Sequence, residues 1–108
     1  MKEFIQITTT TDSRELAAQI AENLVEKKLA ACVQISGPIT SIYEWKNKIE
    51  HEEEWYCVIK TRRGLYREVE ESIKTLHSYE VPEIIALPIL EGSRAYLDWI
   101  TEVVKKEC

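Results

Sequence analysis

Four side chains that can bind cations or exchange protons lie close together in the stretch from residue 77 to residue 83. His77, Tyr79, Glu80 and Glu83 supply one imidazole, one phenol and two carboxylates. Imidazole is a good ligand for copper or zinc, and carboxylate oxygens can complete a mixed nitrogen and oxygen shell. The stretch therefore predicts a divalent-cation site with His77, Glu80 and Glu83 as metal ligands, to which neighbouring subunits could contribute.

His77 also has a purely structural interpretation. A helical pattern ends near this residue, and a histidine there can interact with the helix dipole or satisfy one of the last carbonyls. A structural zinc site normally needs four clustered ligands, which one chain does not offer here. Any metal site would therefore be weak or regulatory, and both interpretations stay open.

A second candidate set is built around aromatic side chains. Tyr43 and Trp45 alternate with Glu44 and Lys46 along an extended segment, so the two rings share one face. Such rings form either the core of a subunit interface or the lining of a cleft between subunits. The predicted cleft set is Tyr43, Trp45, Lys60, His77, Tyr79 and Glu83. Lys60 lies within an apolar strand pattern, where its charge needs a glutamate or a ligand anion as partner.

The acidic run Glu50 to Glu54, which includes His51, could attract cations through its field. It lacks the alternating ligands and the turn glycine of a calcium loop. We therefore predict a solvated hairpin tip, with His51 at the surface. No Walker loop, dinucleotide glycine pattern or nucleophile elbow is present, so we do not expect an enzyme.

The composition predicts one domain spanning residues 1–108. Hydrophobic residues make up 44% and charged residues 31% of the 108 residues, which is typical of a compact soluble fold. The net charge of −5 disfavours nucleic acid and anionic membrane surfaces as partners. No apolar run is long enough to span a bilayer, and no signal-peptide core follows Met1. We expect a cytoplasmic protein, with Cys32 and Cys57 as buried free thiols and Cys108 exposed.

The candidate site residues are positioned by a small set of alternating strands and helices. A capping box at Asp12 to Glu15 predicts the start of the first helix. The pattern predicts strands at 4–7, 31–35, 39–46, 55–61 and 84–90, and helices from about 12 to 29, from 65 to about 77 and from 93 onward. The second and third strand segments could form one bent strand. The apolar run Ile84 to Leu90 predicts a central strand buried on both faces.

This order predicts an α+β fold, a ferredoxin-like βαββαβ sandwich with an additional C-terminal helix and a long projecting β-hairpin. Trp55, Cys57 and Ile59 alternate with Tyr56 and Val58, so both faces of the third strand are apolar. Two helices can cover only one face. We therefore predict a homo-oligomer.

Three segments, in order, closely resemble the CutA divalent-cation tolerance family. They are Leu29-Ala-Ala-Cys-Val33, then Ile39 to Glu50 running on to Ile59-Lys-Thr61, and His77 to Pro88 with Tyr96 to Ile100. The resemblance implies a small ferredoxin-like subunit in a tight homotrimer that is cytoplasmic in bacteria. It also implies a role in metal tolerance, with copper or another divalent cation as the bound ion.

The sequence departs from that family's usual pattern at several positions. Ser78, Asn47 and Gln34 stand where Pro, Gly and Asn are common. Some members carry a Cys near the end of the first strand and a His pair after the second helix. Here Thr8 to Thr10 contains no Cys and Leu76 precedes a single His77. The resemblance therefore carries over His77 alone as a metal ligand.

Two other functions remain as alternatives. The expected architecture is similar to that of the trimeric nitrogen-regulatory PII proteins, whose clefts between subunits hold small ligands, so the chain could be a small-molecule sensor. It could also be a trimeric scaffold that presents the tips at Glu50 to Glu54 to a partner protein.

Overall fold

The structure is a computed structural model that describes residues 3–106. These residues form the predicted succession of strand, helix, two strands, helix, strand and helix. The elements are β1 (Phe4–Thr11), α1 (Arg14–Glu26), β2 (Cys32–Trp45), β3 (Lys48–Arg62), a short 3-10 turn (Arg63–Leu65), α2 (Tyr66–Leu76), β4 (Ile84–Pro88) and α3 (Arg94–Val103).

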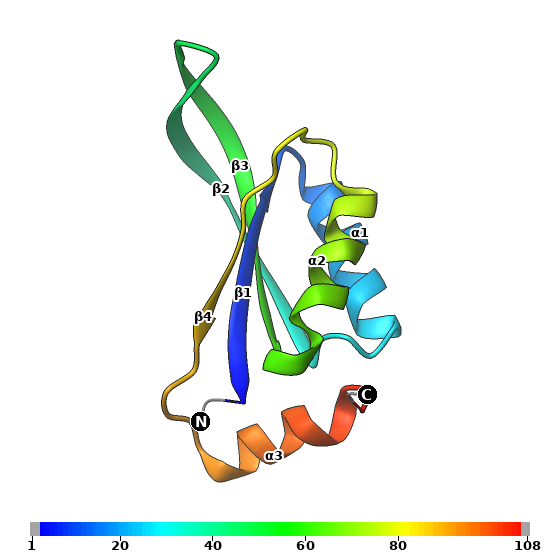
Figure 1. The fold of residues 1–108 in the computed structure, drawn as a ribbon. Helices are drawn as coiled ribbons and strands as arrows, with labels where there is room; N and C mark the ends of the chain where they lie inside the picture. The colour runs from blue at the N-terminus through cyan, green and yellow to red at the C-terminus, as the bar shows by residue number, and fades with distance from the viewer. Residues whose placement is uncertain (1–2, 107–108) are drawn as a thin grey trace.

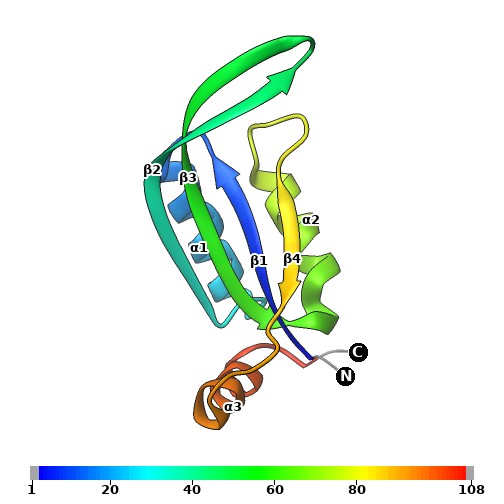
Figure 2. The same ribbon diagram turned by 90° about the vertical axis from the view of Figure 1, so that its left-hand side faces the viewer.

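One antiparallel sheet organises the molecule. The strands lie in the order β2-β3-β1-β4, and every neighbouring pair is antiparallel. Helices α1 and α2 cover one face, whereas α3 crosses the lower end of the sheet (Figures 1 and 2). The predicted α+β fold of the ferredoxin-like type with an additional C-terminal helix is confirmed. No helix among residues 3–106 is long and apolar enough to cross a membrane.

The core lies between the sheet and its two covering helices. Ile7 of β1 and Ile59 of β3 are fully buried and face each other in the strand register. Leu24 of α1 and Ile73 of α2 close the core from the helix side. Burying such side chains contributes roughly 1.5 to 3 kcal/mol each, so this layer fixes the sheet from which the hairpin projects.

The first helix begins one residue later than the predicted capping box requires. Ser13 is the N-cap, and its hydroxyl accepts a hydrogen bond from the backbone N–H of Leu16. Asp12 and Glu15 therefore do not form the expected box. The reason is that β1 continues through the threonine run to Thr11, four residues beyond the predicted end at Ile7. Threonine is β-branched and favours a strand.

The β2–β3 hairpin projects well beyond the rest of the sheet (Figure 1). Its turn is formed by Lys46 and Asn47, which both have positive φ, at 52° and 69°. This matches the mirror-image turns that suit two-residue hairpins, and Asn is one of the residues that tolerate a positive φ. The bend predicted within one long strand is also found, because the β2–β3 register shifts between Ser36 and Ile39.

The acidic run Glu50 to Glu54 was wrongly predicted to form the hairpin tip. All five residues belong to β3 and pair with β2, from Tyr43 opposite Glu50 to Ile39 opposite Glu54. Charged side chains can alternate along a strand whose faces meet water, so an acidic run does not have to be a turn. A scaffold would therefore present these glutamates on the arm of the hairpin and not at its tip.

The prediction of a central β4 buried on both faces was also wrong. β4 pairs with β1 alone and lies at the edge of the sheet. Ile85 is 51% and Leu87 is 55% exposed in this chain. An apolar run shows that side chains favour removal from water, but it does not show which surface covers them.

Candidate functional site

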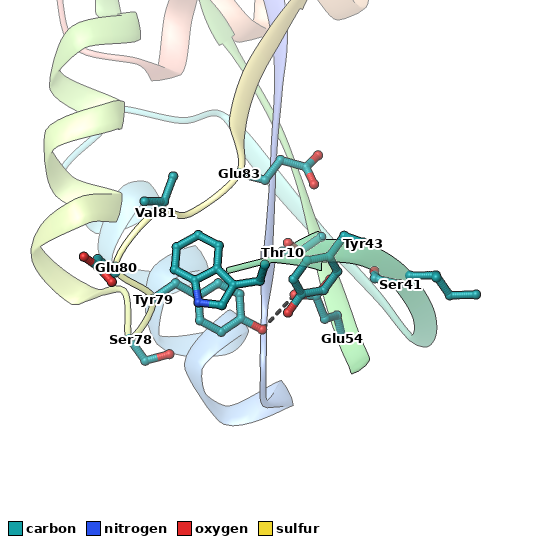
Figure 3. Close-up of a pocket in the computed structure, with 11 residues that line it drawn as sticks. Thr10, Ser41, Tyr43, Glu54, Ser78, Tyr79, Glu80, Val81 and Glu83 are labelled. Carbon is teal, nitrogen blue, oxygen red and sulfur yellow. Dashed lines mark hydrogen bonds between the residues drawn. The ribbon is translucent and has the colours of Figure 1, made fainter. Parts of the chain in front are cut away.

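A cavity of about 620 Å³ lies between the β2–β3 hairpin, the end of β1 and the loop between α2 and β4. It extends from Glu54 at the hairpin base to Trp45 beside the turn. Figure 3 draws its lining side chains as sticks. The lining consists of Thr10, Ser41, Ile42, Tyr43, Trp45, Glu54, Ser78, Tyr79, Glu80, Val81 and Glu83. Five of the residues selected from sequence therefore meet there, namely Tyr43, Trp45, Tyr79, Glu80 and Glu83.

The central polar contact of the cavity joins Tyr79 to Glu54. The phenol of Tyr79 donates a hydrogen bond of 2.7 Å to Oε2 of Glu54 (Figure 3). Glu54 is only 5% exposed. The pKa of the Tyr79 phenol is strongly raised, first by burial and then by this hydrogen bond and the Glu54 charge. The phenol therefore stays protonated and acts as a donor.

The field inside the cavity is negative. Glu54, Glu80 and Glu83 line it, and none of its lining residues is basic. Burial, followed by the charge of Glu54, raises the pKa of the Glu83 carboxyl. Burial also raises the pKa of Tyr43, with further contributions from Glu52, Glu54 and Glu50. Burial is the largest cause of each shift, and the nearby carboxylates add to it in the same direction. The three glutamates, with no basic residue in the lining, are what make the cavity suitable for a cation.

His77 lies beside the cavity and is held by two hydrogen bonds. Its Nε2 lies 2.6 Å from the carbonyl oxygen of Thr10, and its Nδ1 accepts from the backbone N–H of Tyr79 at 3.1 Å. Because a carbonyl can only accept, Nε2 must carry the proton. The ring also packs against Tyr79, with centroids 4.8 Å apart. Nε2 therefore connects the loop to β1, whereas the contact of Nδ1 lies within the loop.

Lys60 does not line the cavity of this chain. Its ammonium donates to Oε1 of Gln34 at 2.5 Å on the exposed side of β3. The glutamate or ligand anion expected as its partner is thus replaced by a neutral amide from β2. Its place in a cleft between subunits stays a prediction.

The described part of the chain contains no group of three or more His, Cys, Asp or Glu side chains arranged to hold a metal ion. His77, Glu80 and Glu83 are neighbours in the loop but do not form such a group. Their role as a metal set stays a prediction. Carboxylate and imidazole groups have the right chemistry, but a complete shell needs rearrangement or additional ligands.

The two described thiols, Cys32 and Cys57, do not line the cavity. Cys57 is fully buried beneath α1, where its Sγ donates weakly to the carbonyl of Ala17 at 3.5 Å. Burial raises the pKa of this thiol to about 11. Cys32 is half-buried and free. The thiol expected to be exposed, Cys108, lies outside the described residues.

Sequence reasoning missed Glu54 as a site residue, together with the hydroxyls of Thr10 and Ser41. The available signal was that Glu54 directly precedes the apolar strand pattern at Trp55, where burial of one more residue is plausible. Its partner Tyr79 lies 25 residues away. That pairing depends on the tertiary fold.

The fold and the site place this chain in a class of small α+β proteins. Its features are a ferredoxin-like sheet, a long projecting hairpin and an acidic, aromatic-lined cavity at the hairpin base. The chain belongs to the CutA1 divalent ion tolerance protein family, whose sequence model matches residues 5–103.

Relatives and solved structures support this membership over nearly the whole chain. The divalent-cation tolerance protein CutA of Thermus thermophilus is 46% identical over 102 residues, covering 94% of this chain and 97% of that protein. Mouse Protein CutA is 45% identical over 96 residues, and this chain spans 54% of its length. The crystal structure of CutA1 from Oryza sativa has a TM-score of 0.95 at 36% identity, covering 98% of this chain and 97% of that one.

Proposed function

We propose that this protein acts in tolerance to divalent cations by binding them, as a cytoplasmic homotrimer in which residues 1–108 form a single domain. The observation that carries the proposal is the cavity at the hairpin base, whose lining contains three glutamates and no basic side chain. Family membership gives the biological setting. Copper is the proposed metal, because an imidazole beside carboxylates suits it.

The proposed ligands are His77, Glu80 and Glu83, and their present contacts make the binding weak. For His77 to coordinate through Nδ1, it must release the backbone N–H of Tyr79. Losing that hydrogen bond costs about 0.5 to 1.5 kcal/mol, which reduces the net affinity. We therefore propose an exchangeable cation and assign no structural metal.

The trimer proposal is supported by apolar surface at the sheet edge. Ile85 and Leu87 point to the face that α1 and α2 leave open, and Val81 is exposed in the preceding loop. A water-facing apolar strand at an edge is a typical docking surface. The number of three subunits comes from the family resemblance.

We propose a binding protein and assign it no catalytic reaction. A sensor role remains the second candidate function, because aromatic residues together with carboxylates line a cavity large enough for a small organic molecule. The two functions differ in the ligand, a metal ion or an organic compound.

Calorimetric titration of Cu(II) into the wild type, His77→Ala and Glu83→Gln tests the metal proposal. We expect weaker binding in both variants. His51→Ala is the matched control, because His51 is exposed on the hairpin and lies outside the cavity lining. Equal affinity and stoichiometry in the wild type and His77→Ala would remove His77 from the site.

A further inference from the structure

Glu54 is a buried carboxylate for which residues 3–106 provide no positively charged partner. Its side chain accepts one hydrogen bond, from the neutral phenol of Tyr79. None of the ion pairs within the described residues includes it. Burying a carboxylate without a counter-charge is costly. Because Glu54 lines the cavity, a cation entering there would supply the missing charge.

Three aromatic side chains line the same cavity. Tyr43 and Trp45 come from β2, and Tyr79 comes from the loop between α2 and β4. The ammonium of Lys46 already lies 5.6 Å from the centroid of the Trp45 ring, so an organic cation on that face would replace it. Tyr43 and Tyr79 both lie close enough to Glu54 for its charge to raise their pKa values. Aromatic faces attract organic cations through their quadrupole, most strongly when the cation leaves water.

The part of the cavity formed by Glu54 and the aromatic side chains fits an organic cation better than a bare metal ion. A metal ion needs several oxygen or nitrogen donors at about 2.0 to 2.6 Å, and the described residues provide no such group of three acidic, His or Cys side chains. A volume of about 620 Å³ also exceeds what one ion fills. An alkylated ammonium group is large and weakly hydrated, and it can contact aromatic faces and a carboxylate together.

We propose that the cavity at the hairpin base is a binding site for small organic cations carrying an alkylated ammonium group. Trp45 and Tyr43 contact the alkyl substituents, and Glu54 supplies the opposite charge. Glu83 adds a second carboxylate at the rim. The hydroxyl of Tyr79 keeps the Glu54 carboxylate in place. Glu83 is shared with the metal proposal, but this inference depends on Glu54 and the aromatic side chains, which the metal proposal does not use as ligands.

The test compares choline with its uncharged isostere 3,3-dimethylbutan-1-ol in calorimetric titrations of the full chain. We expect saturable binding of choline and at least about tenfold weaker binding of the isostere. Equal binding of the two compounds, or no saturable binding of choline, would overturn the proposal. A parallel Cu(II) titration reports the metal proposal separately, so either proposal can fail alone.

Two variants test whether Glu54 and Trp45 form the binding site. Glu54→Gln keeps an oxygen that accepts from Tyr79 but removes the charge, and Trp45→Leu removes an aromatic face that is 37% exposed. Trp99→Leu is the matched control, because Trp99 is 39% exposed on α3 and does not line the cavity. We expect choline binding to weaken at least about tenfold in both site variants and to be unchanged in the control. Equal affinities in Trp45→Leu and Trp99→Leu would contradict the assignment even if Glu54→Gln failed to fold.

Discussion

The phenol of Tyr79 donates a 2.7 Å hydrogen bond to the buried carboxylate of Glu54, joining the loop after α2 to the middle of β3. Two residues earlier, His77 connects the same loop to the carbonyl of Thr10 at the end of β1. The loop is therefore attached to two strands of the sheet. These contacts hold the cavity in its open shape before any ligand arrives.

Replacing Tyr79 with Phe should destabilise the protein, because Glu54 would stay buried after losing its hydrogen-bond donor. Leaving a buried polar group unsatisfied costs about 1 to 3 kcal/mol. Urea unfolding measures the loss. Tyr66→Phe is the control, because no hydrogen bond of the Tyr66 hydroxyl is found within residues 3–106. Similar stabilities for the two variants would show that the Tyr79 contact contributes little.

His77→Ala should be less stable than His51→Ala by about 1 to 3 kcal/mol in the absence of metal. The variant leaves the carbonyl of Thr10 and the backbone N–H of Tyr79 without their ring partners. His51 is exposed on β3, where substitution changes stability by about 0.5 kcal/mol or less. Chemical unfolding with a chelator present makes the comparison. If the two variants were equally stable, His77 would have no structural role.

The buried thiol of Cys57 should make stability depend on alkaline pH. Its pKa is about 11 in the folded chain, above the unfolded value of 9.0. Between these values the unfolded thiol ionises while the folded thiol stays protonated, so the free energy of unfolding falls as pH rises. The stability advantage of the wild type over Cys57→Ala should therefore shrink by about 1 to 3 kcal/mol between pH 9 and pH 11. An equal stability difference between the wild type and Cys57→Ala at pH 9 and at pH 11 would contradict the raised pKa of Cys57.

Leu87→Lys should dissociate the proposed oligomer. In one isolated chain the substitution is tolerated, because Leu87 is exposed on edge strand β4, whereas a lysine buried in an interface lacks a partner. Light scattering after size-exclusion chromatography measures the mass. Val25→Lys is the control, since Val25 is exposed on α1, away from the sheet edge. An unchanged mass for Leu87→Lys would exclude this edge from the interface.

The order of elements could be predicted from sequence because local patterns specify it. The spacing of apolar residues determined α1 and α2, and the positive φ of Asn47 follows from the tolerance of Asn for that region. The helix start was wrong by one residue because Asp12 and Ser13 are both good N-caps. The length of β1 decides between them, and that length depends on pairing with β3.

The cavity could be predicted only in part. Tyr79, Glu80 and Glu83 were recognised because they are adjacent in sequence and chemically distinctive. Glu54 was assigned to a hairpin tip, because its burial depends on a partner 25 residues later. The partner of the His77 ring is 67 residues away. Such contacts arise from the tertiary arrangement and leave no local pattern.

The most direct test of the proposed function is native mass spectrometry of the purified protein before and after addition of Cu(II). We predict a species with the mass of three chains, and additional copper mass on that species after titration. His77→Ala should form the same trimer but retain less copper at equal metal concentration. A monomer, or a trimer that gains no copper under conditions where small-protein complexes survive, would contradict the account.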